Sequence, residues 1–274
     1  MSKRGRGHDE HQCRTVVNSS RTADTNSIRV GRISFTISNL QEATTKVIHA
    51  ANSQNSIPIR LSNAYCVAVA SSDQDYAKEM QKSGLIFADG TPVVWFMKAF
   101  RRGHSMKPGR VRGPSLFLNV LDSGRDTGLR HFFLGSSVST LATMTDNVTS
   151  RFPGVKIAGK HSPPFGPLND EFYNTSLQKI QGSDANIVWV SLGTPKQDYA
   201  ASKLAEAANL PCVAVGAAFD FTAGNVSPAP KWVQNSGFEW LHRLASEPRR
   251  LWKRYLFGNA RFIYSAIFES KRQN

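Results

Sequence analysis

Asp89 is the residue whose position best suits chemistry. It directly follows the apolar run Leu85–Ala88 and precedes Gly90. A short apolar run is typical of a strand buried in a parallel sheet, and such sheets bind ligands beyond the carboxyl ends of their strands. A carboxylate at that edge can act as a general base. The same segment also suits an Asp-Gly turn or a helix cap ahead of Pro92, and spacing alone leaves both interpretations open.

Two glycine-bearing turns also come directly after apolar runs. Gly135 and Ser136 follow one run, and Gly193 and Thr194 follow another. Backbone N–H groups at the start of a helix can approach an anion at such places. A glycine that serves only a tight turn gives the same pattern, so each turn is a weak signal by itself. The sequence contains neither a dinucleotide fingerprint nor a phosphate-binding loop of the G-x-x-x-x-G-K type.

Asp73 and Asp75 form an Asp-x-Asp pattern, which can hold a divalent metal together with a diphosphate. We interpret the pattern instead as the start of a capped helix, because Ser71 and Ser72 precede the acids and apolar residues follow from Tyr76 onward. The seven histidines show no spacing typical of metal ligands. We therefore expect neither a metal site nor a cofactor.

The last part of the chain combines aromatic and basic residues. Arg243, Arg250 and Lys253 are spaced so that they lie on one side of a continuous helix, although Pro248 can divide that helix in two. Guanidinium groups that converge in this way suit a diphosphate, because their contacts are bidentate and permanently charged. A solvated face is the usual alternative for a run of charges.

Composition narrows the class of protein. The 274 residues are 40% hydrophobic, which is enough for a substantial core. Lys and Arg number 34 against 20 Asp and Glu, and a net charge of +14 favours anionic partners: nucleic acid, phosphorylated small molecules or an acidic lipid surface. The three cysteines lack paired spacing, and no run approaches the roughly 20 apolar residues of a membrane span. We expect a cytoplasmic protein that touches the membrane only at its surface.

The order of the apolar runs predicts an α/β fold, with a Rossmann-like parallel sheet covered by helices. Helices are expected at Leu40–Ala51, Val138–Phe152 and Lys196–Ala208, where apolar residues recur every three or four positions. The predicted strands are Ile28–Ile37, Ile57–Leu61, Leu85–Ala88, His131–Leu134, Val155–Ala158, Asn186–Ser191 and Cys212–Val215.

Three regions follow from these patterns. Residues 1–27 are polar and poor in aliphatic side chains, so we expect a flexible tail. Residues 28–227 form the predicted core, and residues 228–274 form a basic, amphipathic helical appendage. Trp and Tyr favour the headgroup region of a membrane, and each Lys or Arg near an anionic surface contributes about 1 kcal/mol. The appendage is therefore expected to bind an anionic membrane surface.

Taken in order, these pieces resemble the WecG/TagA/CpsF family of glycosyltransferases from about residue 30 to residue 265. The segments that carry the resemblance are Ala88–Gly90, Val93–Trp95, Arg110–Pro114, Phe133–Gly135, Arg151–Gly154, Gly193–Gln197, Val215–Phe221, Ala229–Trp232 and Glu247–Arg250. The resemblance implies a UDP-sugar donor, a polyprenyl-diphosphate-linked sugar acceptor and an inverting, metal-independent transfer. It is compatible with a homo-oligomer as well as with a monomer.

The resemblance also implies roles for individual residues. Asp89 matches the proposed base, and Arg110 and Gln197 match residues of the active site. The three cations of the tail match residues proposed to close over the nucleotide. The further substrate-binding residues that we expect are Asn63, Gly135, Ser136, Gly193, Thr194, Phe219 and Asp220.

Two departures from the family pattern concern the choice of sugar. Where several relatives have Thr-x-Asn, this chain has Leu61-Ser62-Asn63, so a threonine hydroxyl is missing. Where some have His-x-Gly-Tyr-Phe, this chain has His161 followed by Ser-Pro-Pro-Phe-Gly, a form found in exopolysaccharide-type members. An N-acetylmannosamine donor therefore does not follow from the resemblance.

Two other functions remain open at this point. The basic charge and interleaved aromatic residues are also typical of a nucleic-acid-binding protein, but the cations gather in the two termini and the core has no nucleic-acid module, so we expect no nucleic acid as partner. A non-catalytic regulator could keep a nucleotide-sugar pocket. The presence of Asp89, Arg110 and Gln197 argues for an enzyme instead.

Overall fold

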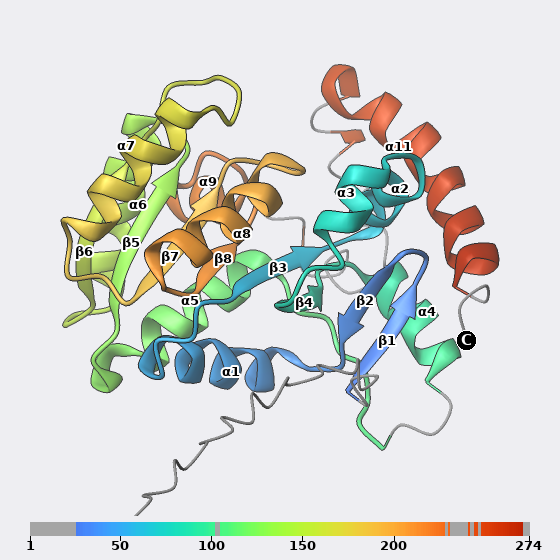
Figure 1. Cartoon of the computed structure of the whole chain (residues 1–274), viewed down its shortest axis with the longest axis horizontal. Coiled ribbons are helices and arrows are strands. Elements are labelled where there is room, and N and C mark those ends of the chain that lie inside the picture. Colours follow the sequence, from blue (N-terminus) through green and yellow to red (C-terminus); the bar gives the residue numbers. More distant parts are fainter. Residues whose placement is uncertain are drawn as a thin grey trace, which may run out of the picture.

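The computed structural model describes residues 26–101, 105–227, 230, 241, 244, 245 and 248–270. Its centre is a six-stranded parallel sheet with helices on both faces, which confirms the predicted α/β class (Figure 1). The strand order is β4-β3-β8-β7-β5-β6. The strands are β3 (Pro58–Ser62), β4 (Leu85–Ala88), β5 (Arg130–Gly135), β6 (Lys156–His161), β7 (Ile187–Ser191) and β8 (Cys212–Ala214).

Helices cover both faces because the central strands are apolar on both sides. One face packs against α1, α5, α6 and α9, around a core that includes Phe117, Phe133 and Trp189. The other face packs against α7 and α8, and α2, α3 and α4 lie at the β4 edge. The bounds are α1 (Leu40–Asn52), α2 (Ala64–Ser72), α3 (Gln74–Glu79), α4 (Thr91–Phe100), α5 (Gly113–Ser123), η1 (Arg125–Thr127), α6 (Val138–Arg151), α7 (Asp170–Gln181), α8 (Lys196–Ala208) and α9 (Ala218–Ala223).

Polar caps begin several of these helices, as the sequence pattern indicates. Asn39 and Glu42 form a reciprocal capping box at the start of α1, and Ser137 accepts a hydrogen bond from the backbone of Thr140 at the start of α6. Asp73 caps α3, because its carboxylate accepts hydrogen bonds from two backbone N–H groups in the first turn. The capped-helix interpretation of the Asp-x-Asp pattern is therefore confirmed.

The first predicted strand is wrong in extent and in partner. Residues 28–37 do not form one strand of the parallel sheet. They belong to an antiparallel hairpin, β1 (Ser27–Val30) and β2 (Ile33–Thr36), which is a separate two-stranded sheet. Val30 pairs with Ile33, so only two residues form the turn, and Gly31 has a φ of 62° there. Glycine adopts this left-handed conformation without strain, which is why the apolar run can reverse at this point.

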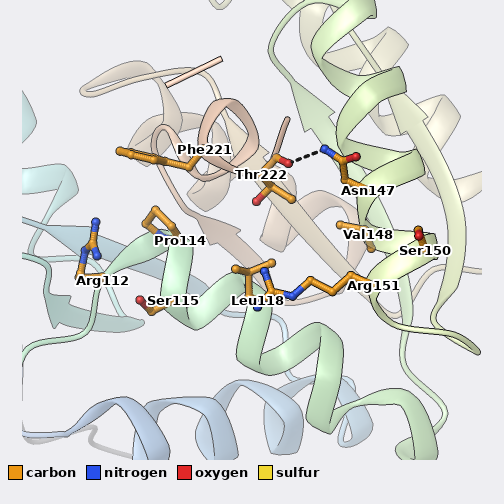
Figure 2. Close-up of a pocket in the computed structure, with 10 residues that line it drawn as sticks. All are labelled: Arg112, Pro114, Ser115, Leu118, Asn147, Val148, Ser150, Arg151, Phe221 and Thr222. Carbon is orange, nitrogen blue, oxygen red and sulfur yellow. Dashed lines mark hydrogen bonds between the residues drawn. The ribbon is translucent and has the colours of Figure 1, made fainter. Parts of the chain in front are cut away.

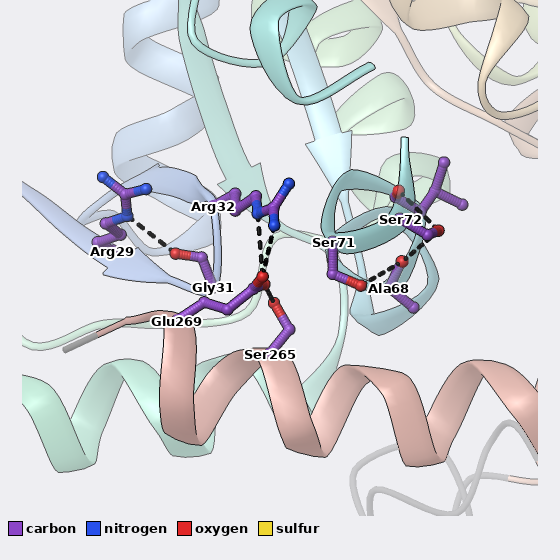
Figure 3. Close-up of polar contacts among 9 residues, drawn as sticks. Arg29, Gly31, Arg32, Ala68, Ser71, Ser72, Ser265 and Glu269 are labelled. Atoms are coloured by element: carbon purple, nitrogen blue, oxygen red, sulfur yellow. Dashed lines mark hydrogen bonds and ion pairs between the residues drawn. The ribbon is translucent and has the colours of Figure 1, made fainter. Parts of the chain in front are cut away.

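The chain ends in a helix that is bonded to this hairpin. α11 (Pro248–Tyr264) lies along α2, at the opposite end of the molecule from α6 and α7, and continues into a π-helical turn, η2 (Ser265–Glu269) (Figure 1). Arg32 forms an ion pair of 2.7 Å with Glu269, as Figure 3 shows. The backbone N–H of Gly31 donates to the Ser270 hydroxyl at 2.7 Å. Phe262 and Ala266 are buried in the core around α2 and β1.

These contacts make the end of the predicted appendage part of the folded body. α11 begins at Pro248, the residue expected to interrupt the helix of the tail. Residues 228, 229, 231–240, 242, 243, 246 and 247 lie outside the described part of the chain. In the part that is described, no helix is both long enough and apolar enough to cross a bilayer.

Phe262→Ala should lower the free energy of unfolding by about 3 to 5 kcal/mol, because it empties a buried aromatic site. Phe268→Ala is the matched control, since that side chain is 55% exposed against 3% for Phe262. The control should change stability by less than about 0.5 kcal/mol. Urea unfolding measures both values, and equal effects of the two substitutions would show that the helix does not pack as described.

Candidate active site

A cavity of about 940 Å³ opens at the carboxyl ends of the strands. This is the edge at which parallel α/β sheets bind ligands, because loops and helix starts converge there. Seven of the residues predicted from the sequence line it: Asn63, Asp89, Ser136, Gly193, Thr194, Gln197 and Asp220. The strand-end argument therefore places residues from five different parts of the chain in one cavity.

Asp89 stands at the meeting point of β4 and α5. It is half-buried, and its Oδ1 accepts a hydrogen bond of 3.3 Å from the backbone N–H of Gly113, the first residue of α5. Its own N–H donates to the carbonyl of Ser62 in β3 at 2.9 Å. Asp89 does not cap α4, whose N-cap is Gly90. The carboxylate is thus fixed by backbone on one side and open to the cavity on the other.

Arg110 lies close to Asp89 in structure but does not line the cavity. Its guanidinium donates to the hydroxyl of Thr91 at 3.2 Å, and Thr91 follows Gly90 at the start of α4. Arg110 therefore contacts the start of α4, next to the turn that carries Asp89.

The starts of two helices face the cavity. Ser136, Ser137 and Thr140 line it at the start of α6, and Gly193 and Lys196 line it at the start of α8. Unpaired N–H groups and the positive end of the helix dipole make such places suitable for phosphate oxygens. The two glycine-bearing turns of the sequence thus form part of the cavity wall, and Lys196 adds a positive charge there.

Gln197 links this wall to the end of β8. Its side-chain oxygen accepts a hydrogen bond of 3.1 Å from the backbone N–H of Gly216, and the residue is almost completely buried. The hydroxyl of Ser191 donates to the carbonyl of Gly216 at 2.6 Å. These two bonds hold the turn after β8, which forms part of the cavity floor.

Two other predicted residues, Phe219 and Gly135, do not line the cavity. Phe219 is fully buried, with its ring centroid 5.5 Å from that of Phe117 and 5.7 Å from that of Phe133, so it supports the core rather than lining the cavity. Its neighbours Asp220 and Phe221 do line the cavity. Gly135 lies behind the cavity, where a Cβ would come within 2.2 Å of the Ser191 carbonyl oxygen.

The cations predicted in the tail are not tested by these contacts. Arg243 lies outside the described residues. Arg250 and Lys253 belong to α11, but their side chains lie outside the described part.

Two cavity residues, Lys196 and Asn225, were not among the residues predicted for the site. Lys196 donates to the carbonyl of Gly166 at 2.6 Å and so joins α8 to the loop after β6. Asn225 donates to the Thr140 hydroxyl at 2.9 Å and joins the turn after α9 to α6. The first of these was detectable as a cation at a helix start, whereas Asn225 carries no local signal because its partner is 85 residues away.

A buried ionisable cluster lies behind the cavity, between β3, α3 and α8. Arg60 is fully buried and pairs with Glu79 at 3.1 Å, and the Tyr76 hydroxyl donates to Asp198 Oδ2 at 2.8 Å. In the described part of the chain, Asp198 Oδ1 has no hydrogen-bond partner. Burial raises the pKa of Asp198 from its ordinary 3.8 to about 7, against the opposing effects of the Tyr76 hydrogen bond and the Arg60 charge. An arginine inside an apolar strand is the sequence signal that could have revealed this cluster.

Asp198 should make the protein less stable as the pH rises. Below about pH 4 the carboxyl is protonated in both the folded and the unfolded chain, whereas between about 4 and 7 only the folded chain keeps the proton. Stability in that window should fall by up to about 1.4 kcal/mol per pH unit. Asp198→Asn keeps an acceptor for Tyr76 and should remove this slope. Urea unfolding at pH 5 and pH 7 tests the difference, and parallel pH dependence in both proteins would contradict it.

A parallel sheet whose strand ends gather a carboxylate and two helix starts around one cavity is the arrangement typical of an α/β enzyme. The model of the Glycosyl transferase WecG/TagA/CpsF family matches residues 28–274 of this chain. The chain therefore belongs to this family of glycosyltransferases.

Two curated relatives are bacillary enzymes, each described as an N-acetylglucosaminyldiphosphoundecaprenol N-acetyl-beta-D-mannosaminyltransferase. The protein from Bacillus spizizenii is 31% identical over 182 residues, which make up 66% of this chain and 67% of that protein. The protein from Bacillus subtilis is 28% identical over 185 residues, or 67% of this chain and 69% of that protein.

Proposed function

We propose that the enzyme transfers a hexose or N-acetylhexosamine from a UDP-sugar to a polyprenyl-diphosphate-linked glycan, with inversion at the sugar and without a metal. The observation that carries this proposal is the position of Asp89, which is bonded to Gly113 and lines the same cavity as the starts of α6 and α8. The names of the two bacillary relatives support the class of acceptor.

The proposed reaction uses this arrangement as follows. The acceptor hydroxyl attacks the anomeric carbon from the face opposite UDP, and its proton passes to Asp89. The new bond between carbon and acceptor oxygen forms as the bond to the phosphate oxygen breaks. UDP leaves with that electron pair, and its added charge is stabilised by the N–H groups of α6 and α8 and by Lys196. The predicted tail cations Arg243, Arg250 and Lys253 would complete this stabilisation.

The identity of the donor sugar is left broader in this proposal than the type of reaction. N-acetylmannosamine is the first donor to test, because it is the sugar named for both relatives. However, both departures from the family pattern involve residues that line the cavity: Leu61 in β3, and Pro163 to Gly166 in the loop after β6. A change of donor is therefore expected to arise from these two segments. UDP release across a panel of UDP-sugars, with membrane extract as acceptor, tests the reaction and the donor together.

Asp89→Asn should retain binding of the UDP-sugar and lower turnover by about two to four orders of magnitude, which is the usual contribution of a general base. Asp75→Asn is the matched control. That carboxylate is exposed, pairs with Lys78, and belongs to the Asp-x-Asp pattern. Its substitution should leave turnover unchanged. Near-normal turnover in Asp89→Asn would remove this residue from the role, and a large loss in Asp75→Asn would favour a metal-dependent reaction.

A membrane-bound acceptor requires the enzyme to reach the membrane surface, and the end of the chain provides an apolar face. Ile263, Tyr264, Ile267 and Phe268 are all exposed on α11 and η2, while Arg249 and Arg261 lie on the same helix. Aromatic side chains with nearby cations are suited to an anionic headgroup region. The proposed site of membrane contact is this face, together with the rest of the predicted appendage.

Replacing Tyr264 and Phe268 together by Ser should weaken sedimentation with anionic liposomes by about tenfold or more, because two apolar side chains lose their burial in the interface. Val138→Ser is the control, since Val138 is also exposed but lies on α6. Truncation at residue 227 is a poorer test, because it would remove Phe262 and Ala266 from the core. Unchanged liposome binding of the double variant would exclude this face.

A further inference from the structure

A second hollow lies beside the active-site cavity, on the other side of α9. It has a volume of about 580 Å³ and runs between α5, α6 and α9 (Figure 2). Pro114 and Phe221 line both this groove and the main cavity, so the two are neighbours along the start of α5. Asn147 donates to the carbonyl of Thr222 at 3.0 Å, which joins α6 to α9 across the far end of the groove.

The groove has a distinct chemistry. The residues that line it all come from the described part of the chain, and they include Arg112 and Arg151 but no acidic side chain. Ser115, Ser150 and Thr222 contribute hydroxyl groups, while Leu118 and Val148 contribute an apolar strip. Figure 2 shows the two arginines on opposite sides of the α5 residues. Two cations, hydroxyls and an apolar strip match a sugar that carries a diphosphate.

The position of the groove relative to Asp89 indicates whether it suits the donor or the acceptor. Arg112 immediately precedes Gly113, whose N–H holds the Asp89 carboxylate. A molecule that lies in the groove could therefore pass Pro114 and Phe221 and place a hydroxyl group near Asp89. The main cavity suits the donor, because the helix starts that fit its diphosphate line that cavity.

We propose that this groove binds the acceptor, with the sugar at the junction near Asp89 and the diphosphate between Arg112 and Arg151. This inference rests on the proposed function. It adds a separate anionic subsite, so donor and acceptor diphosphates are held by different residues on the two sides of α9.

Arg112→Gln and Arg151→Gln should each weaken binding of a short-chain isoprenyl diphosphate N-acetylglucosamine by about 5- to 50-fold, as expected for the loss of one charge-assisted contact. Binding of UDP should stay unchanged. Arg125→Gln is the matched control, because it removes the same charge from an exposed arginine that pairs with Asp122 outside the groove. A neutral isoprenyl glycoside of the same sugar should bind equally to all four proteins. Calorimetric titration measures these affinities.

The outcomes separate the groove from the proposed function. If the wild-type enzyme neither binds the diphosphate probe nor releases UDP in its presence, the proposed acceptor class is wrong. If the wild-type enzyme does both and the two groove variants bind the probe as the control does, the groove is not the acceptor site. An equal loss of UDP affinity in the groove variants would assign the groove to the donor and overturn the inference.

Discussion

The close approach of three backbone segments around Gly113 is the constraint on which the site depends. A Cβ at this residue would lie 2.6 Å from the carbonyl oxygen of Val215, so only glycine lets α5 begin against the end of β8. Because α5 begins there, its first N–H reaches the carboxylate of Asp89 at the end of β4. Backbone packing at Gly113 thus helps to fix the position of the proposed base. Any larger residue at Gly113 would displace the helix that borders both the cavity and the groove.

The sequence was sufficient for most of the fold because the strands are short, apolar on both faces and separated by amphipathic helices. Periodicity detects both patterns without tertiary information. Periodicity gave the wrong result at Gly31. The chain reverses there through a two-residue turn, but the apolar residues continue on both sides of the turn and look like one strand. Periodicity also could not place α11. Its buried residue Phe262 packs near α2 and the hairpin, which are far from it in the sequence.

The candidate site could be predicted in part for a related reason. Asp89, Gly193 and Gln197 follow apolar strands, and the ends of parallel strands meet at one edge whatever their order in the sheet. Phe219 shows where this reasoning stops, because residues that follow a strand in a short helix alternate between cavity and core. Contacts such as that of Asn225 with Thr140 depend on how the turn after α9 packs against α6, and no local pattern encodes them.

The buried charges behind the cavity carry a desolvation cost, which affects how the helices around the cavity are held. Arg60 and Glu79 must leave water together, and their attraction offsets this loss only if the geometry is kept. The same cluster reaches α8 through Asp198, which accepts the hydrogen bond of the Tyr76 hydroxyl in α3, so a shift of α8 would break a buried hydrogen bond. The first turn of α8 carries Gln197 and Lys196 into the cavity. The buried bond between Tyr76 and Asp198 therefore helps to hold the helix whose start lines the cavity.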